Sequence, residues 1–248
     1  MNLEVSDGFS GLNVSNIRKS YNSRLVLRDV SLNLRQREIV ALLGANGTGK
    51  TTCFYTIAGL TSTDSGTITL NGTNISNMPI YKRANLGLSY LPQEPSIFKS
   101  MTVEDNIASV LEISTKDRLV RRVKLESLLE SFSLTNIRKA KAITLSGGER
   151  RRVEIARNLA TYPKYLLLDE PFAGVDPIAV DEIRSLIKGL KERGIGILIT
   201  DHNVRETLKL VDRVYIINDG SIIKSGSPAE IISDNTVKSV YLGASFNL

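Results

Sequence analysis

Residues 44–51, with the sequence GANGTGKT, restrict the fold of this chain more than any other segment. A glycine, four further residues and then Gly-Lys-Thr form the pattern of a phosphate-binding loop. An apolar run at 38–44 precedes the loop, and a helical pattern begins at about Lys50. Glycines let successive backbone N–H groups point toward one anion, and the helix N-terminus adds positive potential. We therefore expect Lys50 to reach terminal phosphates and Thr51 to be available as a Mg²⁺ ligand.

Short apolar runs alternate with helical patterns along the chain. Buried strands are predicted at residues 38–44, 165–170, 195–200 and 213–217, and a helix at 179–192. This alternation indicates an α/β fold with a parallel sheet covered by helices. Residues 12–19, 25–34 and 65–70 instead alternate in the manner of antiparallel strands of a smaller sheet. Residues 96–160 lack strand signals and predict an inserted helical subdomain.

Two adjacent carboxylates, Asp169 and Glu170, end the predicted strand at 165–170. Adjacent side chains at a strand end point in different directions, so the two groups are expected to have separate roles. Asp169 would belong to the Mg²⁺ shell, and Glu170 would face the attacking water as general base or water-positioning group. Without the phosphate-binding loop, the pair would equally fit an acidic turn.

The segment LSGGE at residues 145–149 opens a predicted helix that continues to Ala160. Ser146 is suited to cap this helix, and Gly147 and Gly148 leave backbone N–H groups accessible. The helix N-terminus is therefore a second candidate site for an anion, although a capped surface helix would have the same pattern.

Composition excludes several classes of protein. A chain of 248 residues with one cysteine and one histidine forms neither a disulfide framework, nor a Cys-rich zinc site, nor a His cluster. No apolar run approaches the roughly 20 residues of a membrane span. The polar, acidic N-terminus, Met1 to Ser10, does not resemble a signal peptide. These features fit a reducing, cytoplasmic location.

The net charge of +6 is concentrated in three clusters. The basic residues concerned are Arg118, Arg121, Arg122 and Lys124, then Arg138, Lys139 and Lys141, then Arg150, Arg151 and Arg152. Such clusters fit solvated helix faces, an acidic ligand, an anionic membrane surface or nucleic acid. Because no aromatic residues are interleaved with them to stack on bases, nucleic-acid binding is not expected.

The phosphate-binding loop, the LSGGE segment and the acidic strand end about twenty residues later together resemble the ATP-binding subunits of ABC transporters. The resemblance covers nearly the whole chain and implies ATP as substrate and Mg²⁺ as cofactor. It implies a P-loop NTPase (RecA-like) core with a parallel sheet, a small antiparallel β subdomain and an inserted α-helical subdomain. Within a single ATPase domain of residues 1–248, residues 1–95 and 161–248 would form the core, and 96–160 the helical signature subdomain.

Four further positions match the family and take their expected roles from it. Tyr21 would stack on adenine, Gln93 would sense Mg²⁺ and the attacking water, Asp176 would lie in a dimer-contact loop, and His202 would contact the γ-phosphate. The implied catalytic residues are Lys50, Gln93, Glu170 and His202, and the implied Mg²⁺ ligands are Thr51, Gln93 and Asp169. The implied nucleotide-binding residues are Tyr21, Gly44, Ala45, Asn46, Gly47, Thr48, Gly49, Lys50, Thr51, Thr52, Ser146, Gly147, Gly148 and Asp176.

Two positions depart from the commonest family pattern. Glu149 stands where glutamine is commonest, and the loop before Asp176 reads AGVD rather than ALD. Both departures loosen the assignment of those individual contacts and leave the nucleotide site unaffected.

In this family two subunits pack head to tail around two ATP molecules. The resemblance therefore implies that Ser146, Gly147 and Gly148 of one chain cover the γ-phosphate held by Lys50 of the other. A single ATPase unit without a membrane span implies a homodimer, or a heterodimer with a relative. It also implies a separate transmembrane permease, which would hold the chain at the cytoplasmic face of the bacterial inner membrane.

The permease is expected to be contacted near Gln93, Ile97 and Phe98. An apolar pair beside the glutamine loop suits a groove that receives a partner's short helix. Phe98 would alternatively be part of the core of the helical subdomain.

Within the family, residues 87–106 and 169–178 are most similar to ATPases of bacterial lipopolysaccharide export. The tail, with VYLG at 240–243 followed by Phe246 and Leu248, is similar too. The expected function is an ATPase motor that drives lipopolysaccharide extraction and export. Branched-chain amino-acid importers, which share the AGVD-type loop, are the alternative.

Other classes with a phosphate-binding loop fit less well. A nucleic-acid-linked ABC ATPase carries two ATPase units or a long coiled-coil insert, which 248 residues do not accommodate. A P-loop kinase or GTPase does not need LSGGE, and no guanine-recognition motif is present.

Overall fold

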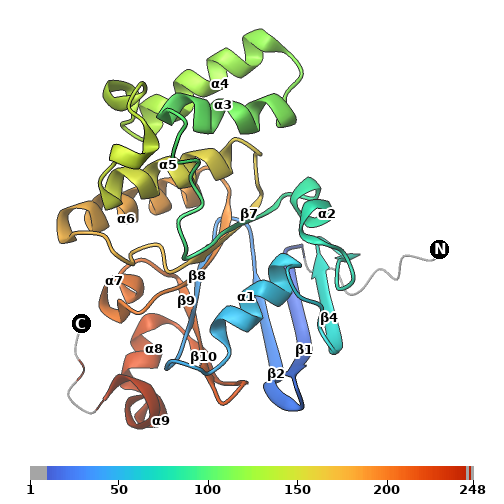
Figure 1. The fold of residues 1–248 in the computed structure, drawn as a ribbon. Helices are drawn as coiled ribbons and strands as arrows, with labels where there is room; N and C mark the ends of the chain where they lie inside the picture. Colours follow the sequence, from blue (N-terminus) through green and yellow to red (C-terminus); the bar gives the residue numbers. More distant parts are fainter. Residues whose placement is uncertain (1–9, 244–245, 247–248) are drawn as a thin grey trace.

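The computed structural model describes residues 10–243 and 246 (Figure 1). Residues 1–9, to which the expectation about a signal peptide applies, lie outside the described residues. Leu248 of the tail lies outside them too. The strands are β1 (Leu12–Tyr21), β2 (Arg24–Leu34), β3 (Ile39–Leu43), β4 (Ser65–Leu70), β5 (Thr73–Asn74), β6 (Leu88–Leu91), β7 (Tyr165–Asp169), β8 (Gly196–Thr200), β9 (Arg213–Asn218) and β10 (Ser221–Gly226).

Helices connect these strands. They are α1 (Lys50–Ala58), α2 (Ile80–Asn85), α3 (Val103–Ser114), α4 (Arg118–Ser131), α5 (Gly147–Leu159), α6 (Pro177–Glu192), α7 (Val204–Leu208), α8 (Pro228–Ser233) and α9 (Asn235–Val237). Short 3₁₀ turns lie at Thr135–Ile137 and Ala142–Thr144, and a π-helical turn lies at Lys238–Leu242. Within the described part of the chain, no helix combines the length and the hydrophobicity needed to cross a bilayer.

The strands form one sheet in the order β5-β4-β1-β2-β10-β9-β3-β8-β7-β6. The strands from β9 to β6 in this order pair in parallel, and β1, β2, β4 and β5 pair antiparallel, so both predicted strand types are confirmed. The antiparallel strands do not form a separate sheet, because a single parallel pair, Ser221 with Asp29, joins them to the rest. The sequence analysis missed β6, a four-residue strand between Gly87 and Pro92.

Residues of β3, β7 and β8 alternate between two hydrophobic cores, one on each face of the sheet. Val40, Leu167 and Leu198 pack with α1 and with β1, β2 and β4, whereas Ala41 and Leu168 pack with α3, α5 and α6. Because both faces are covered, these strands are buried at every position, and their residues before Asp169 and Thr200 are mainly apolar, as in parallel strands of α/β proteins.

Helices α3 and α4 lie side by side at the top of Figure 1, above α5 and α6. Residues 96–160 thus contain helices and no regular strand among their described residues, in agreement with the predicted helical content. The subdomain boundaries at 95/96 and 160/161 stay a prediction. Helix α5 shares its core with the central strands through Val153, Ile155 and Ala156, so this region is packed onto the sheet.

A buried arginine fixes the end of α1, the helix that follows the phosphate-binding loop. Arg83 on α2 is 1% exposed, and its Nη1 donates to the carbonyl oxygens of Thr56 at 2.7 Å and Ile57 at 2.6 Å. Its other nitrogens donate to the carbonyl oxygens of Met78 and Ser76. The guanidinium therefore satisfies carbonyls at the C-terminus of α1 that have no partner within the helix.

Substitution of Arg83 by leucine is expected to destabilise the fold by about 3 kcal/mol, because four buried carbonyl groups lose their donor. The free energy of unfolding from urea titration measures the loss. Lys82→Leu, at an exposed position on the same helix, is the matched control and should change stability by less than about 0.5 kcal/mol. Equal losses in the two variants would contradict a capping role for Arg83.

Candidate functional site

A cavity of about 550 Å³ opens at the carboxyl ends of the parallel strands. The loop after β3 holds Lys50, β6 leads to Gln93, β7 leads to Glu170, and β8 leads to His202. Since β3, β8, β7 and β6 are successive neighbours, these side chains meet at one edge of the sheet, where ligands bind in open α/β folds. The lining residues are Tyr21, Arg24, Val26, Asn46, Gly47, Gly49, Lys50, Thr51, Thr52, Gln93, Glu170 and His202.

The loop between β3 and α1 wraps around the Lys50 ammonium. Lys50 Nζ donates to the carbonyl oxygens of Gly44 at 2.7 Å and Ala45 at 2.8 Å, and the Thr48 hydroxyl also donates to Ala45. Burial lowers the pKa of Lys50, and the negative charges of Glu170 and Asp169 partly oppose that shift. The loop thus places one cation at the N-terminus of α1, facing the cavity.

Two glycines of the loop are required by its geometry. Gly49 has a φ of 106°, and a Cβ there would lie 2.8 Å from a methyl group of Leu27. Gly44 has no room either, since a Cβ there would lie 2.2 Å from the carbonyl oxygen of Ile217. The backbone can therefore curve around an anion only with glycine at these two positions.

Glu170 occupies the opposite wall of the cavity. Its carboxylate accepts a hydrogen bond from Gln93 Nε2 at 2.7 Å and pairs with His202 Nε2 at 2.6 Å. Glu170 also has a φ of 47°, a left-handed conformation that non-glycine residues rarely adopt, and its N–H donates to the Thr200 carbonyl. Gln93 and His202, which follow two other strands, therefore both contact the carboxylate of Glu170.

Asp169 has different partners from Glu170 and does not line the cavity. Its Oδ2 accepts a hydrogen bond from the Tyr90 hydroxyl at 3.0 Å, and its side chain is almost fully buried behind the cavity wall. Burial raises the pKa of Asp169, and the Tyr90 hydrogen bond acts in the opposite direction. A carboxylate held in this way can ligate a cation.

Arg151 connects the candidate signature helix to these strand ends. From α5 its guanidinium donates to the carbonyl oxygens of Asp169 and Pro92, each at 3.0 Å, and pairs with Glu154 at 3.1 Å. Sequence analysis noted Arg151 only as one member of a basic cluster. It missed Tyr90, Arg24 and Val26 altogether.

The LSGGE segment lies outside the cavity. Ser146 caps α5, as predicted, and the Glu149 carboxylate accepts a hydrogen bond from the Ser146 N–H at 2.8 Å. The glutamate that departs from the family pattern thus completes a capping box. Gly147 instead borders a second cavity of about 320 Å³ together with Gln93 and Gly174.

Other predicted residues also lie away from the cavity. Asp176 caps α6 by accepting from the Ala179 N–H at 3.0 Å. Gly44, Ala45, Thr48 and Asp169 support the cavity without lining it, and Ser146 and Gly148 do not line it either. Within one described chain, the structure therefore does not bring the LSGGE segment or Asp176 to the phosphate-binding loop.

The pair expected to face a partner divides into two different environments. Ile97 is 6% exposed and packs in the core with α3 and α5, so its side chain has little surface to offer a partner. Phe98 is 51% exposed, and the guanidinium of Arg157 lies 5.0 Å from its ring centre. Of these two residues, Phe98 is the one with an exposed side chain, and the permease contact stays a prediction.

The C-terminal tail packs against the phosphate-binding loop. Burial raises the pKa of Tyr241 to about 12, while a hydrogen bond with the Gly44 backbone acts in the opposite direction. Phe246 lies beside Arg205, whose guanidinium is 5.4 Å from the ring centre. The tail therefore supports the loop from outside the cavity.

Comparison with known proteins relates this geometry to a family. A model of the ABC transporter family matches residues 27–173. A protein of Azorhizobium caulinodans named "Probable ABC transporter ATP-binding protein" is 56% identical over 94% of this chain and 83% of its own length. The lipopolysaccharide export system ATP-binding protein LptB is 53% identical in Haemophilus influenzae and 50% identical in Escherichia coli, over 96% of this chain and 99% of each relative.

Solved structures give the same result. A nucleotide-free ATP-binding cassette of an ABC transporter is 29% identical, with a TM-score of 0.85 over 95% of this chain and all of the other. A second cassette, in its ADP conformation, is 30% identical, with a TM-score of 0.84 over 95% of this chain and 99% of the other.

Two substitutions should separate nucleotide binding from hydrolysis. Lys50→Ala is expected to weaken ATP affinity about thirtyfold, because charge-assisted hydrogen bonds to phosphate are lost. Glu170→Gln should keep affinity within about threefold and lower kcat at least a hundredfold, because the carboxylate at the cavity wall is neutralised. Equilibrium binding and steady-state phosphate release measure the two effects. Near-normal hydrolysis by Glu170→Gln would remove this residue from its expected role.

Tyr90→Phe should shift the acid limb of activity to higher pH. Loss of the hydroxyl donor raises the pKa of Asp169 further, so protons compete with a cation for this carboxylate from a higher pH downward. The Mg²⁺ concentration for half-maximal hydrolysis, measured across pH, tests this. Tyr81→Phe, at an exposed tyrosine, is the control. Superimposable profiles for wild type and Tyr90→Phe would contradict the link.

Proposed function

The chain belongs to the ABC transporter ATP-binding family, and from this premise we propose that it is the ATPase subunit of a bacterial lipopolysaccharide export system. Family membership makes it an ATP-binding ATPase of a transporter. The proposal adds the identity of the transported molecule, lipopolysaccharide.

One observation carries the choice of cargo. Two LptB proteins from different bacteria share 50–53% identity with this chain and are matched over 99% of their length. The match therefore extends over nearly the whole length of both chains and is not confined to the nucleotide-binding motifs. A shared nucleotide site alone would not require such coverage.

The cavity supports a division of labour among the predicted residues. Lys50 and the N-terminus of α1 would hold the terminal phosphates, and Tyr21 at the cavity edge would stack on the adenine. Glu170 would orient or deprotonate the attacking water, while Gln93 and His202, which hold its carboxylate on both sides, would keep it aimed at the phosphate.

The donor set also fits a magnesium ion. Thr51 and Gln93 line the cavity, and Asp169 lies directly behind it, so oxygen ligands of the type that Mg²⁺ prefers surround the expected phosphate position. We assign these three residues to the ion. Mg²⁺ would neutralise charge on the phosphates, while Tyr90 and Arg151 keep the Asp169 strand end in place.

Two copies would complete the site. Ser146, Gly147 and Gly148 face away from the cavity of their own chain, and Asp176 lies near them at the start of α6. We propose a head-to-tail homodimer in which these residues cover the ATP of the opposite chain. Permease subunits would hold the dimer at the cytoplasmic face of the inner membrane.

Affinity purification of tagged Glu170→Gln from detergent-solubilised source cells, followed by mass spectrometry, tests the proposal. Lipopolysaccharide-export permease subunits are the expected companions. An amino-acid permease would overturn the cargo while leaving the motor mechanism. Ribosomal or DNA-repair proteins without a membrane subunit would overturn the transporter role itself.

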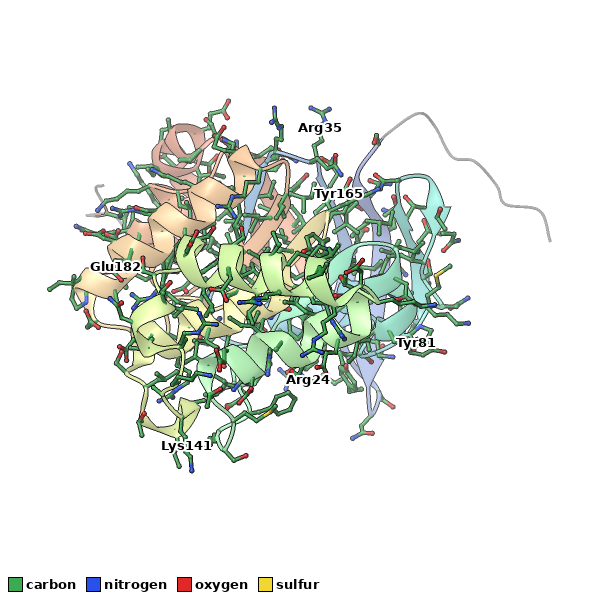
Figure 2. The ribbon with its side chains drawn as sticks, turned by 90° about the horizontal axis from the view of Figure 1, so that it is seen from above. Arg24, Arg35, Tyr81, Lys141, Tyr165 and Glu182 are labelled. Atoms are coloured by element: carbon green, nitrogen blue, oxygen red, sulfur yellow. The ribbon has the colours of Figure 1, made fainter. Side chains whose placement is uncertain are left out.

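Phe98→Ala should separate catalysis from assembly. The exposed ring, which lies against the Arg157 guanidinium, would pack against a permease helix. Its removal should therefore reduce the amount of co-purified permease at least tenfold. Basal ATPase activity should stay within about twofold of the wild type. Tyr81→Ala is the matched control. Tyr81 is 62% exposed. Lys141 marks the region of Phe98, because it pairs with Thr102 close to that residue, and Figure 2 shows Tyr81 on a different side of the molecule from Lys141. If the Phe98→Ala variant recovers as much permease as the wild type, the proposed contact is contradicted.

A further inference from the structure

The end of the α3–α4 hairpin carries three aliphatic side chains that are largely exposed. Ile113 is 88% exposed, Leu119 75% and Val123 69%. Leu119 and Val123 are four residues apart and share one outward face of α4. The helix packs inward mainly through Leu129, so its first two turns carry an apolar face that the fold does not use. We call residues 113–124 the hairpin tip.

The hairpin tip is also the most basic part of the surface. Residues 116–124 contain five basic side chains and one acidic one, a net charge of +4 out of +6 for the whole chain. The N-terminus of α4 adds further positive potential, which the capping carboxylate of Asp117 offsets only in part.

Three arginines of the hairpin tip take part in no ion pair. Among residues 10–243, Arg118, Arg121 and Arg122 form none, although Arg122 lies close enough to Glu126 to lower the pKa of that carboxyl. Guanidinium groups without an ion pair, beside exposed aliphatic side chains, are the composition of a surface helix that lies on an anionic bilayer. A merely solvated helix would have no use for Leu119 and Val123 on the outward face.

The hairpin tip is held rigidly, so its side chains are presented together. Ser114 Oγ donates to the Ala160 carbonyl at 2.9 Å, and Lys124 Nζ donates to Thr115 Oγ1 at 3.1 Å. The Lys124 ammonium also lies 3.8 Å from the ring centre of Tyr162, a half-exposed tyrosine with an apolar body and a polar end. Aromatic residues of this kind favour the headgroup region of membranes.

We propose that the hairpin tip is a contact site for anionic phospholipid headgroups. Ile113, Leu119 and Val123 enter the boundary between headgroups and acyl chains, and Arg118 and Arg122 flank them at the level of the phosphates. The tip lies at the far end of α3 from Phe98, about 18 Å along the helix axis. It is therefore a second attachment, separate from the proposed permease contact, and lies in the helical layer of α3 and α4 at the top of Figure 1.

Charge complementarity selects this occupant. An apolar cavity of about 440 Å³, lined by Val123, Leu128, Tyr162 and Leu190 among others, continues from the tip toward α6. Ile113 and Leu119, however, do not line this cavity, and residues 113–124 contain five basic side chains and one acidic side chain, Asp117. A fluid anionic surface satisfies both features without a matching shape.

Sedimentation of the full chain with vesicles tests the proposal. We expect binding to phosphatidylcholine vesicles that contain phosphatidylglycerol, weak binding to pure phosphatidylcholine, and a decline in binding with rising salt. Arg118→Gln/Arg122→Gln should weaken the partition coefficient about twenty-five-fold. Leu119→Ser/Val123→Ser should remove the part of the binding that persists at high salt.

The control variant, Lys82→Gln/Lys188→Gln, removes the same charge from exposed positions on α2 and α6. It should bind vesicles like the wild type. If this variant loses as much vesicle binding as Arg118→Gln/Arg122→Gln, binding depends on overall charge and the proposal is overturned. The proposal is also overturned if the wild type binds no vesicles, or binds both vesicle types with equal affinity. Unchanged basal ATPase activity and melting temperature in all variants establish that the fold is intact. No permease is present in this assay, so its outcome is independent of the cargo.

Discussion

The parallel pairing of β3, β8, β7 and β6 is the constraint on which the rest of this molecule depends. Strand register places Asp169 beside Thr200 and Leu91 beside Leu168, so the segments after these strands begin at one level of the sheet. Residues separated by more than 150 positions in sequence thereby meet around one cavity. A shift in the pairing of one strand would move its cavity-lining side chain away from the others and would exchange the two faces of the strand.

Charge balance at this edge follows from the same arrangement. Lys50 is buried among carbonyl oxygens at the start of α1, and Glu170 and Asp169 lie near enough to oppose the effect of burial on its pKa. Gln93 and His202 hold Glu170 from two sides, and Tyr90 holds Asp169. A negatively charged nucleotide therefore meets a cation and a helix N-terminus on one wall and a fixed carboxylate on the other.

Helix α5 connects this edge to the surfaces that face other molecules. Its first residues carry the LSGGE segment, and Arg151 one turn later binds the backbone on both sides of the cavity wall, at Pro92 and Asp169. Further along, Arg157 supports Phe98. The proposed dimer contact, the catalytic edge and the proposed permease contact are thus joined through one rigid helix. The hairpin tip extends the same helical layer, and a lipid contact there would orient it relative to a membrane.

Sequence alone determined the features whose physics is local. Glycines at 44 and 49 are required by backbone conformation and close approach, apolar runs identify strands that are buried on both faces, and Ser146 is recognisable as a helix cap. The pattern of each is carried by residues within one turn or one strand and is visible in the chain, although the groups that approach Gly44 and Gly49 come from the distant residues Ile217 and Leu27.

Tertiary structure decided what depends on residues far apart. The four-residue strand β6 is too short to be identified by periodicity, and only its pairing with β7 defines it. Tyr90, Arg151 and Arg83 were not distinguishable from ordinary polar residues, because their roles come from partners 18 to 79 positions away. Ile97 and Phe98 are adjacent apolar residues with opposite exposure, since packing against α3 and α5 buries one and leaves the other outside. Sequence thus determined the chemistry of the loop and strand ends, and the sheet decided which of these groups meet, because only strand pairing sets distances between distant parts of a chain.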